Sequence, residues 1–327
     1  MRRAAALICA VSVMLCFSSC ELTEIPSREV SHHIEVPPKM LFLGDSIAAG
    51  YGLAGYSADD LYSCDSYANI LSEKYEEEIG DKCGHEMVNK AVSGATSADL
   101  IELIRSGELD GDLKDCDAVV ISIGGNDLLD IMLGFLSRLG IDEKGSFDSD
   151  NFDFFSAASY FLSMNDDVDK ALGQFEINIG TISDELDKRT DGTVYIQTLY
   201  DPLEHFSKFK KAAEFSDQKI GRLNDIISEN SGGRYKVIDV AADFKGRADE
   251  LTNIASFDIH PNADGHKLIA DDVDAAFRAT GFSYVTTEYG EKRLTREGKM
   301  AVGGGIAGLA AVIGIILAAV ILKKKKK

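Results

Sequence analysis

Short apolar runs alternate along this sequence with longer segments in which apolar residues recur at helical spacing. The clearest run covers residues 118–123 and is largely β-branched, as is typical of strands that are covered on both faces. Strands that are joined through helices form right-handed crossovers, which produce a mostly parallel sheet with helices on both sides. The alternation therefore predicts one open α/β domain and no second domain.

Five strands and five main helices are predicted from this pattern. The strands cover residues 40–43, 86–92, 118–123, 193–199 and 235–240. The helices cover residues 66–79, 98–106, 167–188, 217–229 and 263–279.

Residues 1–20 differ from the rest and have the pattern of a secretory signal peptide. Two arginines precede an uncharged stretch over residues 4–17, and small residues follow it. Residues 17–20 also resemble a bacterial lipoprotein cleavage box, with Phe17 where leucine is usual. Two outcomes remain open, a lipid-modified Cys20 or ordinary cleavage nearby.

The other end predicts a membrane-spanning helix. Residues 301–322 carry no charge and are long enough to cross the hydrocarbon core, and the lysines at 323–327 favour the cytoplasmic side. We therefore expect a single-pass protein of the cell membrane whose folded domain lies outside. Residues 21–38 are expected to be an extended tether, and residues 280–300 a polar stalk.

The part expected outside the membrane is strongly acidic. All 54 acidic residues and 27 of the 34 basic residues lie between positions 21 and 299, which gives this part a formal charge of −27. Such a charge argues against nucleic acid and strongly anionic substrates, although solubility outside the cell explains it equally well. The three remaining cysteines show no metal-binding spacing. An exported domain permits a disulfide between Cys64 and Cys83, with Cys116 buried beside a strand.

Residues suited to serine hydrolysis follow the predicted strands. Ser46 comes after the first strand, Gly94 after the second and Asn126 after the third, while His260 precedes the last helix. Because the carboxyl ends of parallel strands meet at one edge, these residues should lie close together. Hydrolysis by serine needs a hydroxyl, a base that takes its proton, and donors for the oxyanion.

These positions resemble the four blocks of the SGNH hydrolase family, also called GDSL esterases. Gly-Asp-Ser at 44–46, the glycine at 94, Gly-x-Asn-Asp at 124–127 and His-Pro at 260–261 occur in the family's order. The resemblance covers residues 39–279. It implies a three-layer α/β/α flavodoxin-like fold with strand order 2-1-3-4-5, and hydrolysis of carboxylic esters with no cofactor or metal.

The resemblance also implies a role for each residue of the site. Ser46 would be the nucleophile and His260 the general base that later protonates the leaving alcohol. The backbone N–H groups of Ser46 and Gly94 and the side-chain amide of Asn126 would form the oxyanion hole.

The acid of the triad departs from the family pattern. The family usually has aspartate three residues before the histidine, where this sequence has Phe257. We expect Asp258, two residues before His260, to take this role, and the alternative is a backbone carbonyl that orients the histidine. Asp45 and Asp127 are interpreted as structural residues.

Residues 128–162 form an insertion after the third strand that is rich in phenylalanine and acidic residues. This segment is predicted to be either a lid over an acyl group or extra helices that cover the sheet.

The sequence therefore predicts a membrane-anchored serine esterase that acts on acetyl or short acyl esters outside the cell. O-acetylated polysaccharides, lipid esters and thioesters all remain possible substrates. One alternative is a surface binding or adhesion module on the same fold. A flavodoxin-like nucleotide binder is disfavoured, because the turn after the first strand lacks the P-loop lysine and the glycine spacing of a dinucleotide fold.

Overall fold

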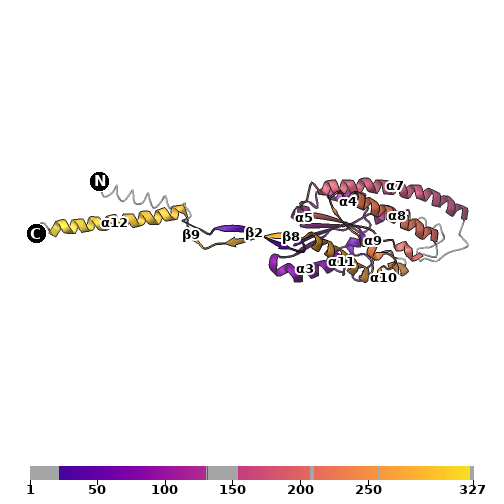
Figure 1. Ribbon diagram of the computed structural model, residues 1–327, viewed down its shortest axis with the longest axis horizontal. Coiled ribbons are helices and arrows are strands. Elements are labelled where there is room, and N and C mark those ends of the chain that lie inside the picture. Colours follow the sequence, from indigo (N-terminus) through magenta and orange to yellow (C-terminus); the bar gives the residue numbers. More distant parts are fainter. Residues whose placement is uncertain (1–21, 130, 132–153, 207–209, 257, 325–327) are drawn as a thin grey trace. The chain divides into compact units, whose positions relative to one another are not determined.

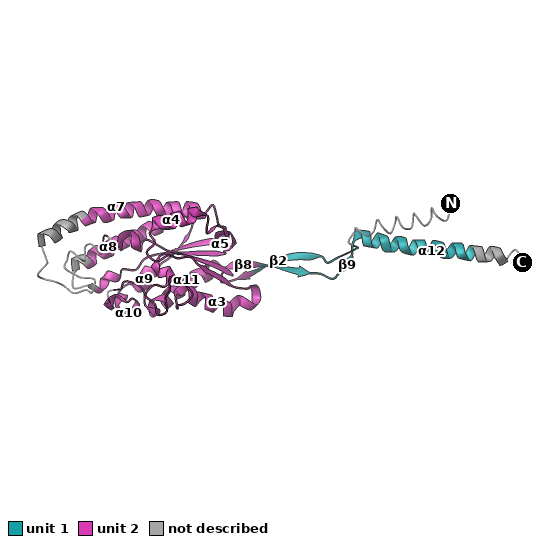
Figure 2. Cartoon of the chain, turned by 180° about the vertical axis from the view of Figure 1, so that it is seen from behind, with its two compact units in different colours: residues 1–32, 285–327 teal, residues 33–284 magenta. Residues whose placement is uncertain are grey.

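The computed structural model describes residues 22–129, 131, 154–206, 210–256 and 258–324. The chain divides into two compact units (Figure 2). One is formed by residues 33–284, and the other by the segments on either side of it, up to residue 32 and from residue 285.

The larger unit is built on a five-stranded parallel sheet, as predicted (Figure 1). Its strands are β3 (Lys39–Gly44), β4 (Glu86–Asn89), β5 (Ala118–Ser122), β6 (Thr193–Gln197) and β7 (Lys236–Ile238). They lie in the order β4-β3-β5-β6-β7, and each neighbouring pair is parallel. This order is the 2-1-3-4-5 arrangement that the family resemblance implied.

Helices cover both faces of this sheet. One face packs against α4 (Ser97–Ser106), α5 (Asp110–Asp115), α7 (Phe154–Leu186) and α8 (Lys210–Glu229). The other packs against α3 (Tyr67–Cys83), α9 (Val240–Phe244), α10 (Ala248–Leu251) and α11 (Ala263–Thr280). Short elements complete the unit: α2 (Ser46–Ala49), η1 (Pro202–Phe206) and η2 (Ile254–Ser256).

The central strands β3 and β5 are mostly apolar because both of their faces are buried. In β5, Val119 and Ile121 pack into the core on the side of α7, whereas Ala118 and Val120 pack into the core on the side of α3. Successive side chains of a strand point to opposite faces, so a strand between two helical layers has no position that faces solvent.

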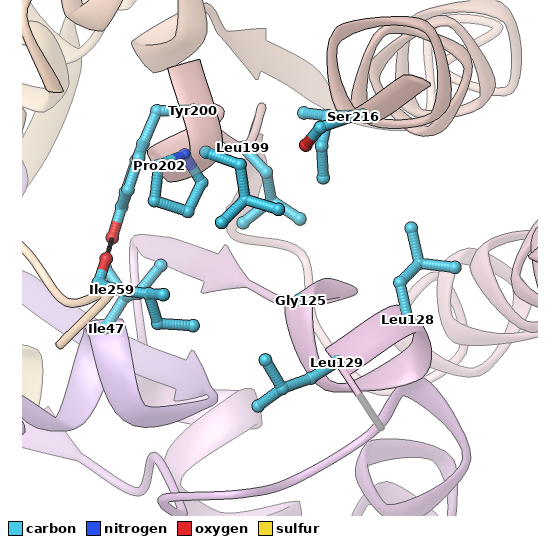
Figure 3. Close-up of a pocket in the computed structure, with 11 residues that line it drawn as sticks. Ile47, Gly125, Leu128, Leu129, Leu199, Tyr200, Pro202, Ser216 and Ile259 are labelled. Atoms are coloured by element: carbon cyan, nitrogen blue, oxygen red, sulfur yellow. Dashed lines mark hydrogen bonds between the residues drawn. The ribbon is translucent and has the colours of Figure 1, made fainter. Parts of the chain in front are cut away.

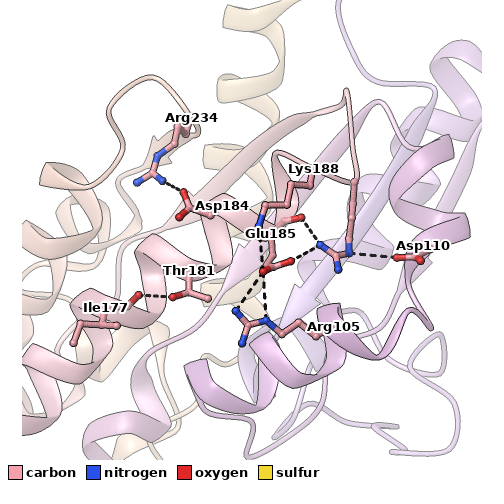
Figure 4. Close-up of polar contacts among 9 residues, drawn as sticks. Arg105, Asp110, Ile177, Thr181, Asp184, Glu185, Lys188 and Arg234 are labelled. Atoms are coloured by element: carbon pink, nitrogen blue, oxygen red, sulfur yellow. Dashed lines mark hydrogen bonds and ion pairs between the residues drawn. The ribbon is translucent and has the colours of Figure 1, made fainter.

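Ion pairs join the ends of the helices on one face (Figure 4). Glu185 of α7 accepts from Arg105 of α4 at 3.3 Å and from Arg189 at 2.5 Å, and Arg189 also contacts Asp110 of α5 at 3.4 Å. Several of these side chains are exposed, so the pairs contribute more to the arrangement of the helix ends than to stability.

The second unit contains a short antiparallel ladder and one long helix. In this ladder β1 (Thr23–Glu24) pairs with β9 (Arg293–Leu294). A second ladder pairs β2 (Ser27–Ile34) with β8 (Phe282–Tyr289), and the division between the two units falls within both strands. Arg28 bonds Glu288 across the second ladder at 2.6 Å. The segments expected to be an extended tether and a polar stalk are therefore strands for much of their length, and their pairing was not predicted.

Helix α12 (Arg296–Lys324) contains the segment that was predicted to span the membrane. Its stretch Arg296–Ala318 is long and apolar enough to cross a membrane. The predicted signal peptide with Cys20, and most of the insertion over residues 128–162, lie outside the described residues.

The three described cysteines are free thiols, so the disulfide considered for Cys64 and Cys83 is absent. The Cys64 thiol is buried and donates to the Gly50 carbonyl, whereas the Cys83 thiol donates to the Ile79 carbonyl in the last turn of α3. Each thiol therefore has its own local acceptor.

Candidate active site

Ser46 lies where β3 turns sharply into a short helix. Gly44 ends the strand with a φ of +119°, and a Cβ built on it would lie 1.9 Å from the Ser122 carbonyl oxygen. Only glycine fits this turn, because any side chain would collide with the backbone of β5. Ser46 is then the first residue of α2, with Asp45 as its N-cap.

Asp45 holds this turn in place, as expected for a structural residue. Its carboxylate accepts from the Ile47 backbone N–H at 3.0 Å and from the Ser122 hydroxyl at 3.2 Å. The side chain is buried, and burial raises the pKa of Asp45 to about 7. Both of these hydrogen bonds act on the turn that carries Ser46.

Ser46, His260 and Asp258 form a continuous chain of hydrogen bonds. The Ser46 hydroxyl lies 2.9 Å from Nε2 of His260, and Nδ1 of His260 lies 2.5 Å from Oδ1 of Asp258. The residues come from two segments 214 positions apart, the turn after β3 and the loop before α11. The structure therefore brings together the predicted nucleophile, base and acid.

A local turn explains how aspartate reaches the histidine from only two positions away. Oδ1 of Asp258 also accepts from the backbone N–H of His260 at 3.0 Å, which is the short-range bond of an Asx-turn. The loop is closed by a bond from the Asn253 N–H to the His260 carbonyl at 2.9 Å. This turn folds the carboxylate back onto the ring of its own histidine.

The loop after α2 packs against this pair and was missed by the sequence analysis. The Tyr51 ring lies 4.6 Å from the His260 ring, measured between centroids. Gly52 has a φ of +88°, and a Cβ on it would lie 3.0 Å from Oδ2 of Asp258 and 3.3 Å from Cβ of His260. The Gly-Tyr-Gly run at 50–52, directly after the serine block, was the available signal for this close approach.

Gly94 and Asn126 follow the carboxyl ends of β4 and β5, the two strands on either side of β3, and their turns are linked. Gly94 has a φ of +86° in the turn after β4, in which the Ala95 N–H bonds the Val92 carbonyl at 3.0 Å. Asn126 lies in a helical turn after β5, and its Nδ2 donates to the Ala95 carbonyl at 2.9 Å. This bond uses one amide hydrogen and leaves the other for a ligand.

Asp127, the next residue, also links the segment after β5 to the segment after β4. It accepts from the backbone N–H of Ser97 at 2.9 Å and from the Ser97 hydroxyl, while Asn178 of α7 donates to that hydroxyl at 2.8 Å. Its carboxylate is thus used within the fold, which agrees with the structural role expected for Asp127.

An apolar cavity of roughly 100 Å³ adjoins the site (Figure 3). Three of its lining residues are sequence neighbours of the predicted site residues: Ile47 follows Ser46, Gly125 precedes Asn126, and Ile259 precedes His260. The remaining lining residues are Leu128, Leu129, Leu199, Tyr200, Pro202, Leu203, Ser216 and Ile220. The cavity therefore offers mainly hydrocarbon surface to a ligand.

The two polar side chains of this cavity already have partners. The Tyr200 hydroxyl donates to the Ile259 carbonyl at 2.8 Å, and the Ser216 hydroxyl donates to Asp201 at 2.7 Å. Within the part of the chain that the structure describes, no group of three or more His, Cys, Asp or Glu side chains is arranged to hold a metal ion.

Residues 42–268, more than half of the chain, match the sequence profile of the GDSL-like Lipase/Acylhydrolase family. The chain belongs to this family. As a GDSL-like acylhydrolase, it is a carboxylic ester hydrolase.

Relatives and solved structures agree with the family. The protein is 26% identical to the spore germination lipase LipC of Bacillus licheniformis, over 72% of this chain and 93% of that one. It is 21% identical to the uncharacterized protein YpmR of Bacillus subtilis, over 83% of this chain and 94% of that one.

Two solved lipases share its fold. A lipase from a goat rumen metagenome, Lip_vut3, has a TM-score of 0.54 at 20% identity, over 73% of this chain and 96% of that one. An extracellular lipase from Streptomyces rimosus has a TM-score of 0.53 at 18% identity, over 73% of this chain and 99% of that one.

Proposed function

We propose that this GDSL-like hydrolase is a membrane-anchored serine esterase that removes acetyl or short acyl groups outside the cell. The observation that carries the proposal is the hydrogen-bonded chain from the Ser46 hydroxyl through His260 to Asp258. A serine hydroxyl becomes a useful nucleophile only beside a base that takes its proton, and the base needs a partner that fixes its tautomer.

In the first half of the reaction, Ser46 Oγ attacks the ester carbonyl while its proton moves to Nε2 of His260. Asp258 accepts from Nδ1–H and stabilises the imidazolium that forms. The backbone N–H groups of Ser46 and Gly94 and the Asn126 amide donate to the oxyanion. His260 then gives its proton to the leaving alcohol, and an acyl group remains on Ser46.

In the second half, His260 takes a proton from water as that water attacks the acyl group. The same donors stabilise the second oxyanion, and proton return to Ser46 releases the carboxylic acid. Every proton thus moves between substrate, water, Ser46 and His260.

The size of the apolar cavity favours a substrate with a small acyl group. Its lining neighbours Ser46, Asn126 and His260 in sequence, and its volume of roughly 100 Å³ suits a short hydrocarbon chain better than a long one. Burial of each methylene there would favour binding by about 0.8 kcal/mol, until the cavity is full.

The C-terminal helix supports attachment to a membrane. Within α12, the apolar stretch Arg296–Ala318 is followed by lysines, and lysines favour the cytoplasmic side. Together with the signal-peptide pattern of residues 1–20, this order supports a hydrolase unit outside the cell.

A non-catalytic binding module on the same fold was the alternative, because the triad aspartate is shifted by one position from the family pattern. The contact of 2.5 Å between Asp258 and His260 removes this reason, because the carboxylate reaches the ring despite its shifted position.

The test compares the full-length protein in detergent with its Ser46→Ala variant, using p-nitrophenyl acetate as substrate. We expect kcat to fall at least about 10,000-fold in this variant. Ser228→Ala is the matched control, because Ser228 is an exposed serine on α8 whose hydroxyl donates to the local Asn224 carbonyl. Equal rates for Ser46→Ala and the wild type would refute the proposal.

A further inference from the structure

Two adjoining clefts open beside the turn that carries Gly94. The smaller, of about 340 Å³, is lined by Gly44, residues 92–95, Asp99, Leu100 and Leu103. The larger, of about 550 Å³, is lined by residues 58–62, residues 89–92, Leu103, Glu108 and Leu109. Val92 and Leu103 line both clefts, so the two adjoin, and the smaller one includes Gly94 of the predicted oxyanion hole. We call the two clefts together the β4 groove.

Tyr62 provides a fixed aromatic surface in the β4 groove. Its hydroxyl accepts from the Asn89 N–H and donates to the Met87 carbonyl, both at 3.4 Å, along the outer edge of β4. The side chain nevertheless remains 56% exposed. A tyrosine anchored through its hydroxyl loses little further freedom when a ligand covers its ring.

The rest of the groove mixes apolar and acidic groups. Val92, at the junction of the two clefts, is 53% exposed. The acidic side chains along the groove are Asp59, Asp60, Asp99 and Glu108, and the one cation that lines it in the described chain is Lys90. Carboxylates accept hydrogen bonds from hydroxyl groups, whereas an excess of them repels anions.

The β4 groove and the apolar cavity are lined by different residues. The cavity adjoins Ser46, Asn126 and His260 through Ile47, Gly125 and Ile259, whereas the groove contains Gly94 itself. An ester has two sides that diverge from its carbonyl carbon, so two separate recesses at one oxyanion site can each receive one side. The apolar cavity suits the acyl side, which leaves the mixed groove for the alcohol side.

We propose that the β4 groove binds the alcohol side of the substrate, and that this alcohol is a neutral chain with many hydroxyl groups, such as an oligosaccharide. This inference rests on the proposed esterase function and adds the class of its leaving group. A sugar ring has apolar C–H faces that stack on an exposed tyrosine and hydroxyls that donate to carboxylates. A hydrocarbon chain would make no hydrogen bonds to the exposed carboxylates of the groove, and covering them would remove the water that solvates them.

The first test measures binding without turnover. The full-length Ser46→Ala protein is titrated by calorimetry with partly O-acetylated cellotetraose, with glucose acetate, and with partly O-acetylated tetragalacturonate as an anionic oligomer of equal length. We expect the neutral tetramer to bind at least tenfold more tightly than either of the others. Equal affinity for the tetramer and the single sugar, or for the neutral and anionic oligomers, would overturn the inference.

The second test assigns this affinity to the groove. Tyr62→Ala and Val92→Trp in the Ser46→Ala protein should each weaken binding of the neutral tetramer about tenfold. The matched controls are Tyr289→Ala and Ile177→Trp, whose native side chains are 74% and 63% exposed and line neither cleft. Unchanged binding in both groove variants would contradict the assignment.

Kinetics separate this inference from the proposed function. With Ser46 present, Tyr62→Ala should lower kcat/KM for the acetylated tetramer about tenfold more than it lowers kcat/KM for p-nitrophenyl acetate, whose single ring covers less of the groove. An equal loss for both esters would refute the groove while leaving the esterase function intact. Tyr62-dependent binding in a protein that hydrolyses neither ester would refute the esterase function and support the groove as a binding site.

Discussion

Oδ1 of Asp258 accepts hydrogen bonds from two groups of the same residue, the backbone N–H of His260 at 3.0 Å and its ring Nδ1 at 2.5 Å. The first bond fixes the carboxylate relative to the backbone, and the second fixes the ring relative to the carboxylate. Nε2 is thereby directed at the Ser46 hydroxyl, 2.9 Å away. One short turn thus orients the base of the proposed reaction.

Asp258→Asn should lower kcat by roughly 1,000- to 10,000-fold with little change in the melting temperature. The asparagine oxygen can still accept from the His260 backbone, but an amide that turns its NH2 toward Nδ1 favours the wrong tautomer. The matched control is Asp264→Asn, an exposed aspartate in the first turn of α11. A loss of less than tenfold in hydrolysis of p-nitrophenyl acetate would show that the carboxylate does not orient the base.

Asn126→Ala should reduce kcat by about 100- to 1,000-fold, because one donor to the oxyanion is lost. Asn230→Ala is a close control, since Asn230 also donates from Nδ2 to a backbone carbonyl at 2.9 Å, that of Ile226, and lies in the turn directly after α8. Comparable kcat values for the two variants would mean that the Asn126 amide serves the fold alone.

Ile220→Phe should fill part of the apolar cavity that Ile220 lines and so shorten the accepted acyl chain. We expect kcat/KM for p-nitrophenyl butyrate to fall at least tenfold, while that for the acetate changes less than threefold. Ile177→Phe on the exposed surface of α7 is the control. If both esters lose activity in equal proportion, the cavity does not hold the acyl chain.

Asp45 makes the stability of the fold depend on pH. Burial raises its pKa from 3.8 to about 7, so between these values the unfolded chain ionises while the folded protein keeps the proton. The free energy of unfolding therefore falls as the pH rises through this window. Asp45 lowers it by about 1.4 kcal/mol for each pH unit, and by at most about 4 kcal/mol in total.

Asp45→Asn removes this titration. Urea unfolding followed by tyrosine fluorescence should show that the wild type, measured relative to Asp45→Asn, loses stability between pH 4.5 and pH 7.5. The comparison with the variant cancels the contributions of the other buried acids. If the difference in free energy of unfolding between the wild type and Asp45→Asn stays constant, or the wild type gains stability as the pH rises, Asp45 is not protonated in the folded protein.

The sheet and the members of the site were predictable from local patterns. The run at 118–123 is apolar at every position except Ser122 because both faces of β5 are covered, and this excludes a sheet with one face in solvent. Ser46, Gly94 and Asn126 each follow a strand, so a parallel sheet places them at one edge. The predicted strand ends were less accurate. The second strand was predicted to run to residue 92, but β4 ends at Asn89, whose side chain accepts from the Ala91 N–H and so begins the turn early.

Contacts between distant segments were not predictable. The pairing of β2 with β8 joins polar segments more than 250 positions apart, and neither segment has an apolar face strong enough to indicate a partner. The Asx-turn that directs Asp258 depends on backbone angles, which the spacing to His260 does not specify. The close approach of Gly52 to Asp258 became visible only once both loops had been placed.

The central claim is that Ser46 carries the acyl group during turnover. The most direct measurement is mass spectrometry of the full-length protein, quenched in acid shortly after mixing with p-nitrophenyl acetate and then digested. We expect one acetyl group on the peptide that contains Ser46. This group should be lost with time in the wild type. In the His260→Ala variant, which the same ester should label slowly, it should persist. An active wild-type enzyme whose Ser46 peptide stays unmodified at every time point, or whose acetyl group lies on another residue, would contradict it.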